Sequence, residues 1–170
     1  EAHQRGLIVT GHLGLYSAQD AVEDGIDCLE HIWSVLDYII PRGQTRCDCD
    51  FSNPRAIQLI EAIKKNNVAV DPTLVVFRNV ILLGDQQEFV EHPDNARVPE
   101  RMKEGWRRLM QERTFQPESA ELRRKEFRKY QELTRVLYRA GVTLLAGTDA
   151  PEPLVSPGLS MHQELELLVE

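Results

Sequence analysis

The sequence contains no hydrophobic run that approaches the roughly 20 residues of a membrane-spanning helix, and its first six residues are mostly polar. We therefore expect neither a membrane segment nor a signal peptide. Only three of the 170 residues are cysteines, a number that does not form an even disulfide framework. Together these absences predict a protein of a reducing, cytoplasmic setting.

Basic residues are fewer than acidic ones: 20 Lys and Arg face 27 Asp and Glu, so the net charge is −7. Proteins that bind nucleic acid or anionic membranes present a basic surface. The charge balance therefore predicts partners of neither kind. A chain of 170 residues that is 42% hydrophobic is long and apolar enough for one domain with a sizeable core.

Short apolar segments alternate with helical patterns along the chain. The predicted strands are 7–11, 26–30, 68–73 and 142–147. Strands that alternate with helices form parallel sheets with crossover helices. We therefore predict an α/β fold, and specifically part of a (β/α)8 TIM barrel, because four such units are half of an eight-stranded barrel.

Capping and chain-breaking residues mark the ends of the predicted helices. Signals of this kind are Ser17 and Gly25 for the first helix, Ser52, Pro54 and Asn66-Asn67 for the next, Gly141 after a helix over 117–140, and a capping box at Ser160-Met161-His162-Gln163. Residues 75–115 are rich in Arg, Glu and Gln and are too long for a simple connection. We predict a helical insertion over 75–130 within a single domain of residues 1–170.

Metal-binding residue types follow three of the predicted strands. His12, His31 and Asp149 each come just after an apolar run. The C-terminal ends of barrel strands meet in one pocket, where imidazoles bind zinc and similar metals and a carboxylate moves a proton. The alternative is structural: hydrogen-bonded, partly buried histidines, and an aspartate that caps a turn.

Weaker signals surround this constellation. His162 follows a Pro-rich loop and Thr73 follows the third predicted strand, so both are candidates for substrate binding. The sequence Cys47-Asp48-Cys49 lacks the second cysteine pair of a typical metal site, and we expect an exposed loop there.

Four segments in order resemble the amidohydrolase superfamily, in the branch of imidazolonepropionase-like and prolidase-like metal-dependent hydrolases. They are AHxxGLxVTGH at 2–12, DGIDCLEH at 24–31, AGVTLLAGTDA at 140–150 and HQELELLVE at 162–170. The resemblance implies a distorted (β/α)8 barrel with one or two divalent metals. It further implies that His12 and His31 are the ligands of the fifth and sixth strands and that Asp149 is the metal-binding, proton-handling residue of the eighth.

The same resemblance implies a site that is incomplete in this chain. The family's His-x-His of the first strand, the bridging lysine or glutamate of the fourth, and the small β-sandwich have no counterpart in the sequence. The absence of an initiator Met, an opening that resembles the last turn of a helix closed by Gly6, and an uncapped helical end also suggest a fragment. By the resemblance it covers about strands 5–8 of the barrel.

We therefore expect a hydrolase of C–N bonds in small amide, cyclic amide or peptide substrates, with a divalent metal such as zinc and with Asp149 as proton shuttle. The first alternative is a catalytically inactive, truncated half-barrel whose unpaired sheet edges join copies of the chain into a homo-oligomer such as a dimer. A further alternative is another repeated βα module in which His12, His31 and Asp149 are structural.

Overall fold

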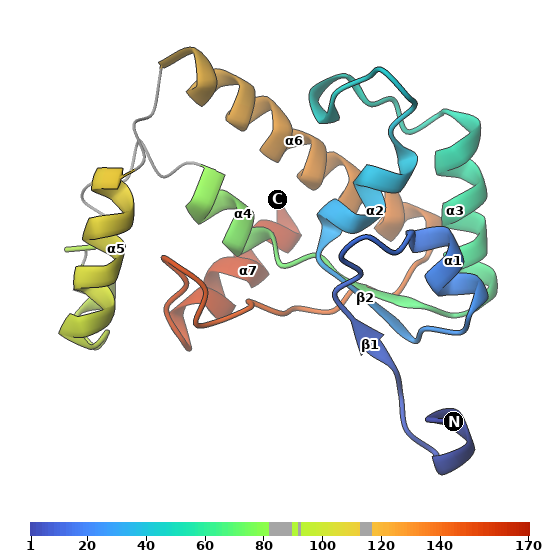
Figure 1. The fold of residues 1–170 in the computed structure, drawn as a ribbon, viewed down its shortest axis with the longest axis horizontal. Helices are drawn as coiled ribbons and strands as arrows, with labels where there is room; N and C mark the ends of the chain where they lie inside the picture. Colours follow the sequence, from blue (N-terminus) through green and yellow to red (C-terminus); the bar gives the residue numbers. More distant parts are fainter. Residues whose placement is uncertain (82–89, 92, 113–116) are drawn as a thin grey trace. The chain divides into compact units, whose positions relative to one another are not determined.

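The structure of the protein is a computed structural model that describes residues 1–81, 90–91, 93–112 and 117–170. Figure 1 follows the helices and strands along the chain. The chain divides into two compact units, one of Glu1–Pro72 with Lys129–Ala146 and one of Thr73–Arg128 with Gly147–Glu170. The single domain over 1–170 and the insertion over 75–130 remain predictions.

A parallel sheet forms the centre of the first unit. Its strands are β1 (Thr10–Gly11), β2 (Cys28–Glu30) and β3 (Ala69–Asp71), in the order β1-β2-β3. Leu144 adds a parallel bridge to Val70 of β3. The α/β class with parallel strands is therefore confirmed. Neighbours that follow one another in sequence are typical of barrels, whereas doubly wound sheets reverse their order; the partial barrel itself remains a prediction.

Paired strands are shorter than the apolar segments of the sequence. The segment over 7–11 pairs as a strand only at Thr10–Gly11, and the segment over 142–147 forms a single bridge at Leu144. Leu7 and Ile8 are 58% and 80% exposed. The apolar pattern therefore predicted longer strands than the structure has, because it does not show which backbone groups have a hydrogen-bond partner.

Three helices belong to the first unit: α1 (Ala18–Glu23), α2 (Ile32–Ile39) and α3 (Pro54–Lys65), with short 3₁₀ turns at η1 (His3–Arg5) and η2 (Arg46–Asp48). Ser17 caps α1 as predicted, since its hydroxyl accepts a hydrogen bond from the Asp20 N–H at 3.1 Å. Asn53 caps α3 ahead of Pro54, and Asn66 ends it. Local side-chain chemistry thus sets these helix ends.

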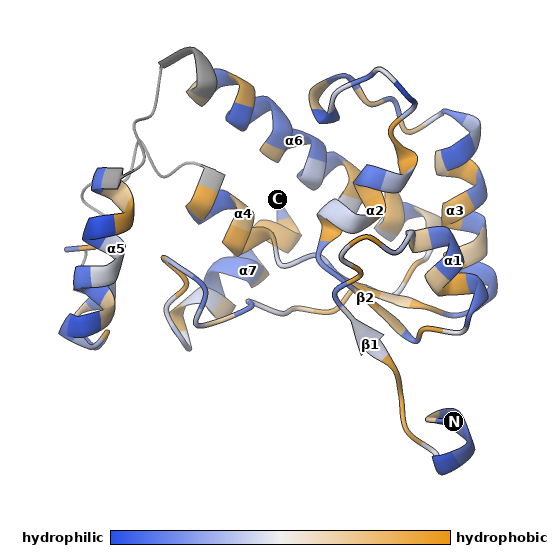
Figure 2. Ribbon diagram, viewed as in Figure 1, coloured by the Kyte–Doolittle hydropathy of each residue, from blue (hydrophilic) through white to orange (hydrophobic). Residues whose placement is uncertain are grey.

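The core of the first unit joins the sheet to its helices. Leu29 of β2, Leu36 of α2 and Leu59 of α3 are fully buried. Leu133 and Leu137, from the last part of α6 (Pro117–Ala140), are buried too. Burial of each such side chain stabilises the fold by about 1.5–3 kcal/mol. Figure 2 shows the hydrophobic colouring of β2.

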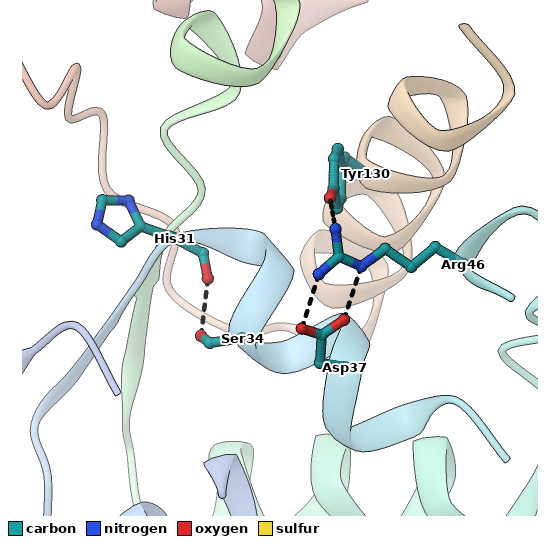
Figure 3. A network of polar contacts seen from close by, with 5 residues as sticks. All are labelled: His31, Ser34, Asp37, Arg46 and Tyr130. Atoms are coloured by element: carbon teal, nitrogen blue, oxygen red, sulfur yellow. Dashed lines mark hydrogen bonds and ion pairs between the residues drawn. The ribbon is translucent and has the colours of Figure 1, made fainter. Parts of the chain in front are cut away.

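A polar network stabilises the same unit at η2. The Arg46 guanidinium forms a two-pronged ion pair with Asp37 of α2, through Nε at 2.7 Å and Nη2 at 2.8 Å. Its Nη1 donates to the hydroxyl of Tyr130 at 3.1 Å. Figure 3 shows Arg46 between these two partners. Because Tyr130 is on α6, the network links α2 and η2 to a helix that is distant from them in sequence.

The segment with Cys47 and Cys49 differs from its prediction as an exposed loop. Cys49 is only 1% exposed, and burial raises the pKa of its thiol. Phe51 is also buried, with the Lys129 ammonium 5.3 Å from its ring. The polar composition of the segment did not indicate that the side chains of Cys49 and Phe51 are buried.

Helices make up the second unit: α4 (Leu74–Ile81), α5 (Glu100–Glu112), the first part of α6 and α7 (Leu159–Val169), with a 3₁₀ turn at η4 (Pro93–Asn95). In Figure 2, α5 is mostly blue. Its Trp106 is nevertheless buried, in a cluster with Val90, Val98 and Leu154. Among the helices that the structure describes, none combines the length and apolarity needed to cross a membrane.

The predicted capping box at 160–163 was wrong. The last helix begins at Leu159, and Gly158 precedes it without a side-chain cap. Ser160 is fully buried, and its hydroxyl donates to the carbonyl of Ser156 at 2.7 Å. A serine that bonds backwards to a carbonyl four residues earlier does not cap the amides ahead of it.

Candidate functional site

His12 and His31 lie side by side at the C-terminal ends of adjacent strands. His12 follows β1 and His31 follows β2, and the two strands are parallel neighbours. Their ring centroids are 5.0 Å apart with an angle of 72° between the planes. The structure therefore brings together two of the ligands that the sequence predicts.

The backbone of His31 has an unusual conformation that its surroundings hold in place. Its φ is +66°, and the residue is 9% exposed. Its N–H donates to the carbonyl of Asp71 at 2.9 Å, and its own carbonyl accepts from the Ser34 hydroxyl at 2.8 Å. In Figure 3 the carbonyl faces Ser34 while the imidazole points away from it. A non-glycine residue with positive φ costs about 1–3 kcal/mol, and these hydrogen bonds hold the His31 backbone in that conformation.

His12 is exposed, and a second aromatic ring supports it. The indole of Trp33, in the first turn of α2, lies edge-on to the His12 imidazole with 5.2 Å between centroids. Such aromatic pairs contribute about 0.5–1.5 kcal/mol. Trp33 is a site residue that the sequence reasoning missed. Its position two residues after His31 in the sequence could have indicated that it lies near the two histidines.

The spacing of the two imidazoles fits a shared metal ion. A tetrahedral zinc with Zn–N bonds of about 2.0–2.1 Å places the centroids of two bound rings about 5 Å apart, close to the 5.0 Å observed. Within the described ranges of the chain, no group of three or more His, Cys, Asp or Glu side chains converges on one point. Catalytic zinc sites usually have three protein ligands, so two histidines alone do not make up such a site.

The strand ends beneath the histidines carry acidic groups. Glu30 and Asp71 are partners in the register of β2 and β3, and the Thr10 hydroxyl donates to the Glu30 carboxylate. Burial, followed by the Glu30 carboxylate, raises the pKa of Cys28 to about 11. The two carboxylates, Glu30 and Asp71, are the acidic groups at this end of the sheet.

A hollow of about 310 Å³ adjoins Trp33 at the same end of the sheet. The loop after β1 and the helix after β2 form most of its wall, and Arg55 completes it from the start of α3. The Arg55 guanidinium lies 4.6 Å from the centre of the Tyr38 ring. The lining is Gly14, Leu15, Tyr16, Ser17, Trp33, Ser34, Asp37, Tyr38 and Arg55. Aromatic and charged groups therefore line this hollow together.

The remaining candidate residues belong to the second unit. Asp149 is exposed, and its carbonyl accepts from the Glu152 N–H at 2.9 Å. Thr73 precedes α4 and is only 2% exposed, whereas His162 is exposed on α7. The roles assigned to these three residues from the sequence remain predictions.

Left-handed backbone is concentrated at the predicted site residues. His31, Thr73 and Asp149 have φ values of +66°, +48° and +53°. Among the other described non-glycine residues, only Asn67 and Leu154 have positive φ. Strained residues of this kind often occur at functional sites. The sequence did not predict the positive φ of Thr73, because a β-branched residue rarely adopts this conformation.

Comparison with known proteins identifies structures of similar fold but no family. No family model matches the chain, and no curated protein matches it. A solved structure described as "AH, Bottromycin amidohydrolase" matches with a TM-score of 0.63 and 22% identity, over 99% of this chain and 37% of the other. A Xaa-Pro dipeptidase solved with bound methionine in its active site matches with a TM-score of 0.52 and 18% identity, over 99% of this chain and 30% of the other.

These matches are informative about architecture. The chain spans about a third of the length of the two solved structures. At such low identity the likeness establishes a shared fold, here one that also occurs in an amidohydrolase and in a dipeptidase. The particular branch of the superfamily and the half-barrel remain predictions.

Proposed function

We propose that this chain forms part of a metal-dependent hydrolase that cleaves the C–N bond of amides, cyclic amides or peptides. The observation that carries the proposal is the pair His12 and His31, 5.0 Å apart at the ends of adjacent parallel strands. The names of the two structural neighbours, an amidohydrolase and a dipeptidase, support the same class of reaction.

In this proposal His12 and His31 each provide a ring nitrogen to one divalent cation, zinc or a similar ion. A bound divalent ion supplies Lewis acidity to a substrate carbonyl and lowers the pKa of water. Hydrogen bonds to Asp71 and Ser34 hold the backbone of His31, and the ring of Trp33 contacts the ring of His12. Ligands that the fold already holds in place lose little conformational entropy when they bind a metal ion.

Asp149 is proposed as a further ligand and as the proton shuttle. Its carboxylate would take a proton from the attacking water and give it to the leaving nitrogen, so that a carboxylic acid and an amine result. Its exposure leaves the carboxylate accessible. His162 and Thr73 are proposed to contact the substrate.

The test is hydrolysis of a panel of amides, cyclic amides and dipeptides by the protein incubated with Zn²⁺. We expect His12→Ala and His31→Ala each to abolish cleavage. His3→Ala is the matched control, because His3 is an exposed histidine bonded to Asp27 at 2.8 Å. Asp149→Asn should slow cleavage, because an amide cannot take the proton of the attacking water. Full activity in His31→Ala would contradict the proposal.

A second candidate function is the self-associating, inactive half-barrel. The exposed apolar side chains of Leu7 and Ile8, just before the edge strand β1, favour it. Edge strands with exposed apolar residues pair with other chains. Light scattering distinguishes the candidates: this one predicts a dimer that Ile8→Lys converts to a monomer, and a monomeric wild-type protein would exclude it.

A further inference from the structure

Two fully buried polar side chains of the second unit have no role in the chemistry proposed above. They are Asn79 on α4 and Glu164 on α7, and each is 0% exposed. Burial of an amide or a carboxylate is unfavourable unless hydrogen bonds compensate it. Their partners therefore show what these side chains hold in place.

Glu164 binds the start of α4. One carboxylate oxygen accepts the Leu74 N–H at 3.0 Å, and the other accepts the Val75 N–H at 2.6 Å. The first amides of a helix lack partners within the helix and carry a partial positive charge. A negative side chain satisfies both needs at once, so Glu164 joins α7 to the beginning of α4.

Asn79 binds the segment that precedes α7. Its side-chain amide donates to the carbonyl of Leu154 at 2.8 Å, and its oxygen accepts from Arg78 Nε at 3.2 Å. Leu154 is fully buried and has a φ of +66°. The bond from Asn79 thus secures the segment at a residue whose backbone is itself strained.

The segment between Asp149 and α7 is consequently fixed at several points. The Glu152 N–H donates to the Asp149 carbonyl at 2.9 Å, and Ser160 holds the Ser156 carbonyl at 2.7 Å. Asn79 binds Leu154 between them, and Glu164 fastens the helix that follows. Helix α4 is therefore the support to which both the loop and α7 are attached.

We propose that Asn79 and Glu164 are positioning residues that hold the loop bearing Asp149 on helix α4. This inference rests on the proposed function, in which Asp149 moves a proton. A proton shuttle must remain within a fraction of an ångström of its working place, and a displacement of about 1 Å costs on the order of 100-fold in rate. An exposed, left-handed residue such as Asp149 depends on its supports for that precision.

The experiment combines hydrogen–deuterium exchange with kinetics on full-length variants. Asn79→Leu keeps the branched shape of the side chain but cannot donate to Leu154. Glu164→Gln places an amide group against a backbone N–H that the carboxylate had accepted. Glu166→Gln, at an exposed position of the same helix, is the matched control.

We expect faster exchange of the Leu74 and Val75 amides in Glu164→Gln, and of the Val155 amide in Asn79→Leu. In both variants kcat for the amide substrate should fall by about 10- to 100-fold while KM changes little. Glu164→Asp, which retains two acceptor oxygens, should recover part of the loss. The control Glu166→Gln should match the wild-type protein in amide exchange, kcat and KM.

Unchanged hydrogen–deuterium exchange in both Asn79→Leu and Glu164→Gln would overturn the inference. Faster exchange with an unaltered kcat would overturn it too. Because Glu164→Gln and Asn79→Leu break different bonds, failure of one to fold leaves the other as the test. A wild-type protein that cleaves none of the substrates would refute the proposed function. Exchange would then still decide whether the two side chains hold the loop.

Discussion

Arg46 links three segments of the first unit, and its removal has a calculable cost. Arg46→Ala deletes both hydrogen bonds to Asp37 and the bond to the Tyr130 hydroxyl. The ion pair is 38% exposed on each side, so solvent reduces its value to about 0.5–1 kcal/mol. The bond to Tyr130, which is 1% exposed, is worth about 1 kcal/mol. We expect a total loss of about 1.5–2 kcal/mol in the free energy of unfolding.

Urea denaturation of single and double variants measures this quantity. Arg46→Lys keeps the charge but not the two-pronged geometry, so it should lose most of the same free energy. A double-mutant cycle of Arg46→Ala with Tyr130→Phe should give a coupling of about 1 kcal/mol. Arg42→Ala, an exposed arginine before the same turn, should stay within about 0.5 kcal/mol of wild type. A coupling energy near zero would refute the reasoning.

Further predictions concern the core, the thiols and the acid range. Leu29→Ala, at a fully buried position of the central strand, should lower the free energy of unfolding by about 3 kcal/mol in urea; a loss below about 1 kcal/mol would contradict its burial. Because burial raises the pKa of Cys28 to about 11, a thiol reagent at mildly alkaline pH should modify the more exposed Cys47 first, and Cys47→Ser should remove that fast phase. The hydrogen bond with His3, followed by that from the Val9 N–H, lowers the pKa of Asp27. Its stabilising contribution is therefore present above the unfolded pKa of about 3.9 and is lost as pH falls through the lower folded value. Urea denaturation of Asp27→Asn across this range should show a weaker dependence on pH than the wild-type protein.

Helix ends were the features most accessible from sequence. Ser17 caps α1, Asn66 ends α3, and Gly141 follows α6 with a φ of +83°. Each of these signals acts within a few residues along the chain, so a local pattern is sufficient to predict it. The positions of His12 and His31 after consecutive strands were accessible for the same reason.

Contacts that depend on the folded chain could not be predicted from the sequence. The strand predicted over 142–147 forms one bridge at Leu144, because its ladder depends on the partner that another segment offers. The capping box failed because Ser160 had a competing acceptor in the carbonyl of Ser156. The contact of Trp33 with His12 and the bonds from Glu164 to α4 join residues that only the folded chain brings together.

Zinc content is the most direct test of the central claim, that His12 and His31 bind one divalent ion. We would measure zinc by elemental analysis on gel-filtered wild-type protein, His12→Ala, His31→Ala and the control His3→Ala, after equal exposure to Zn²⁺. The account predicts stoichiometric zinc in the wild type and in the control, and its loss in both site variants. Equal zinc in all four proteins, or none in the wild type, would contradict it.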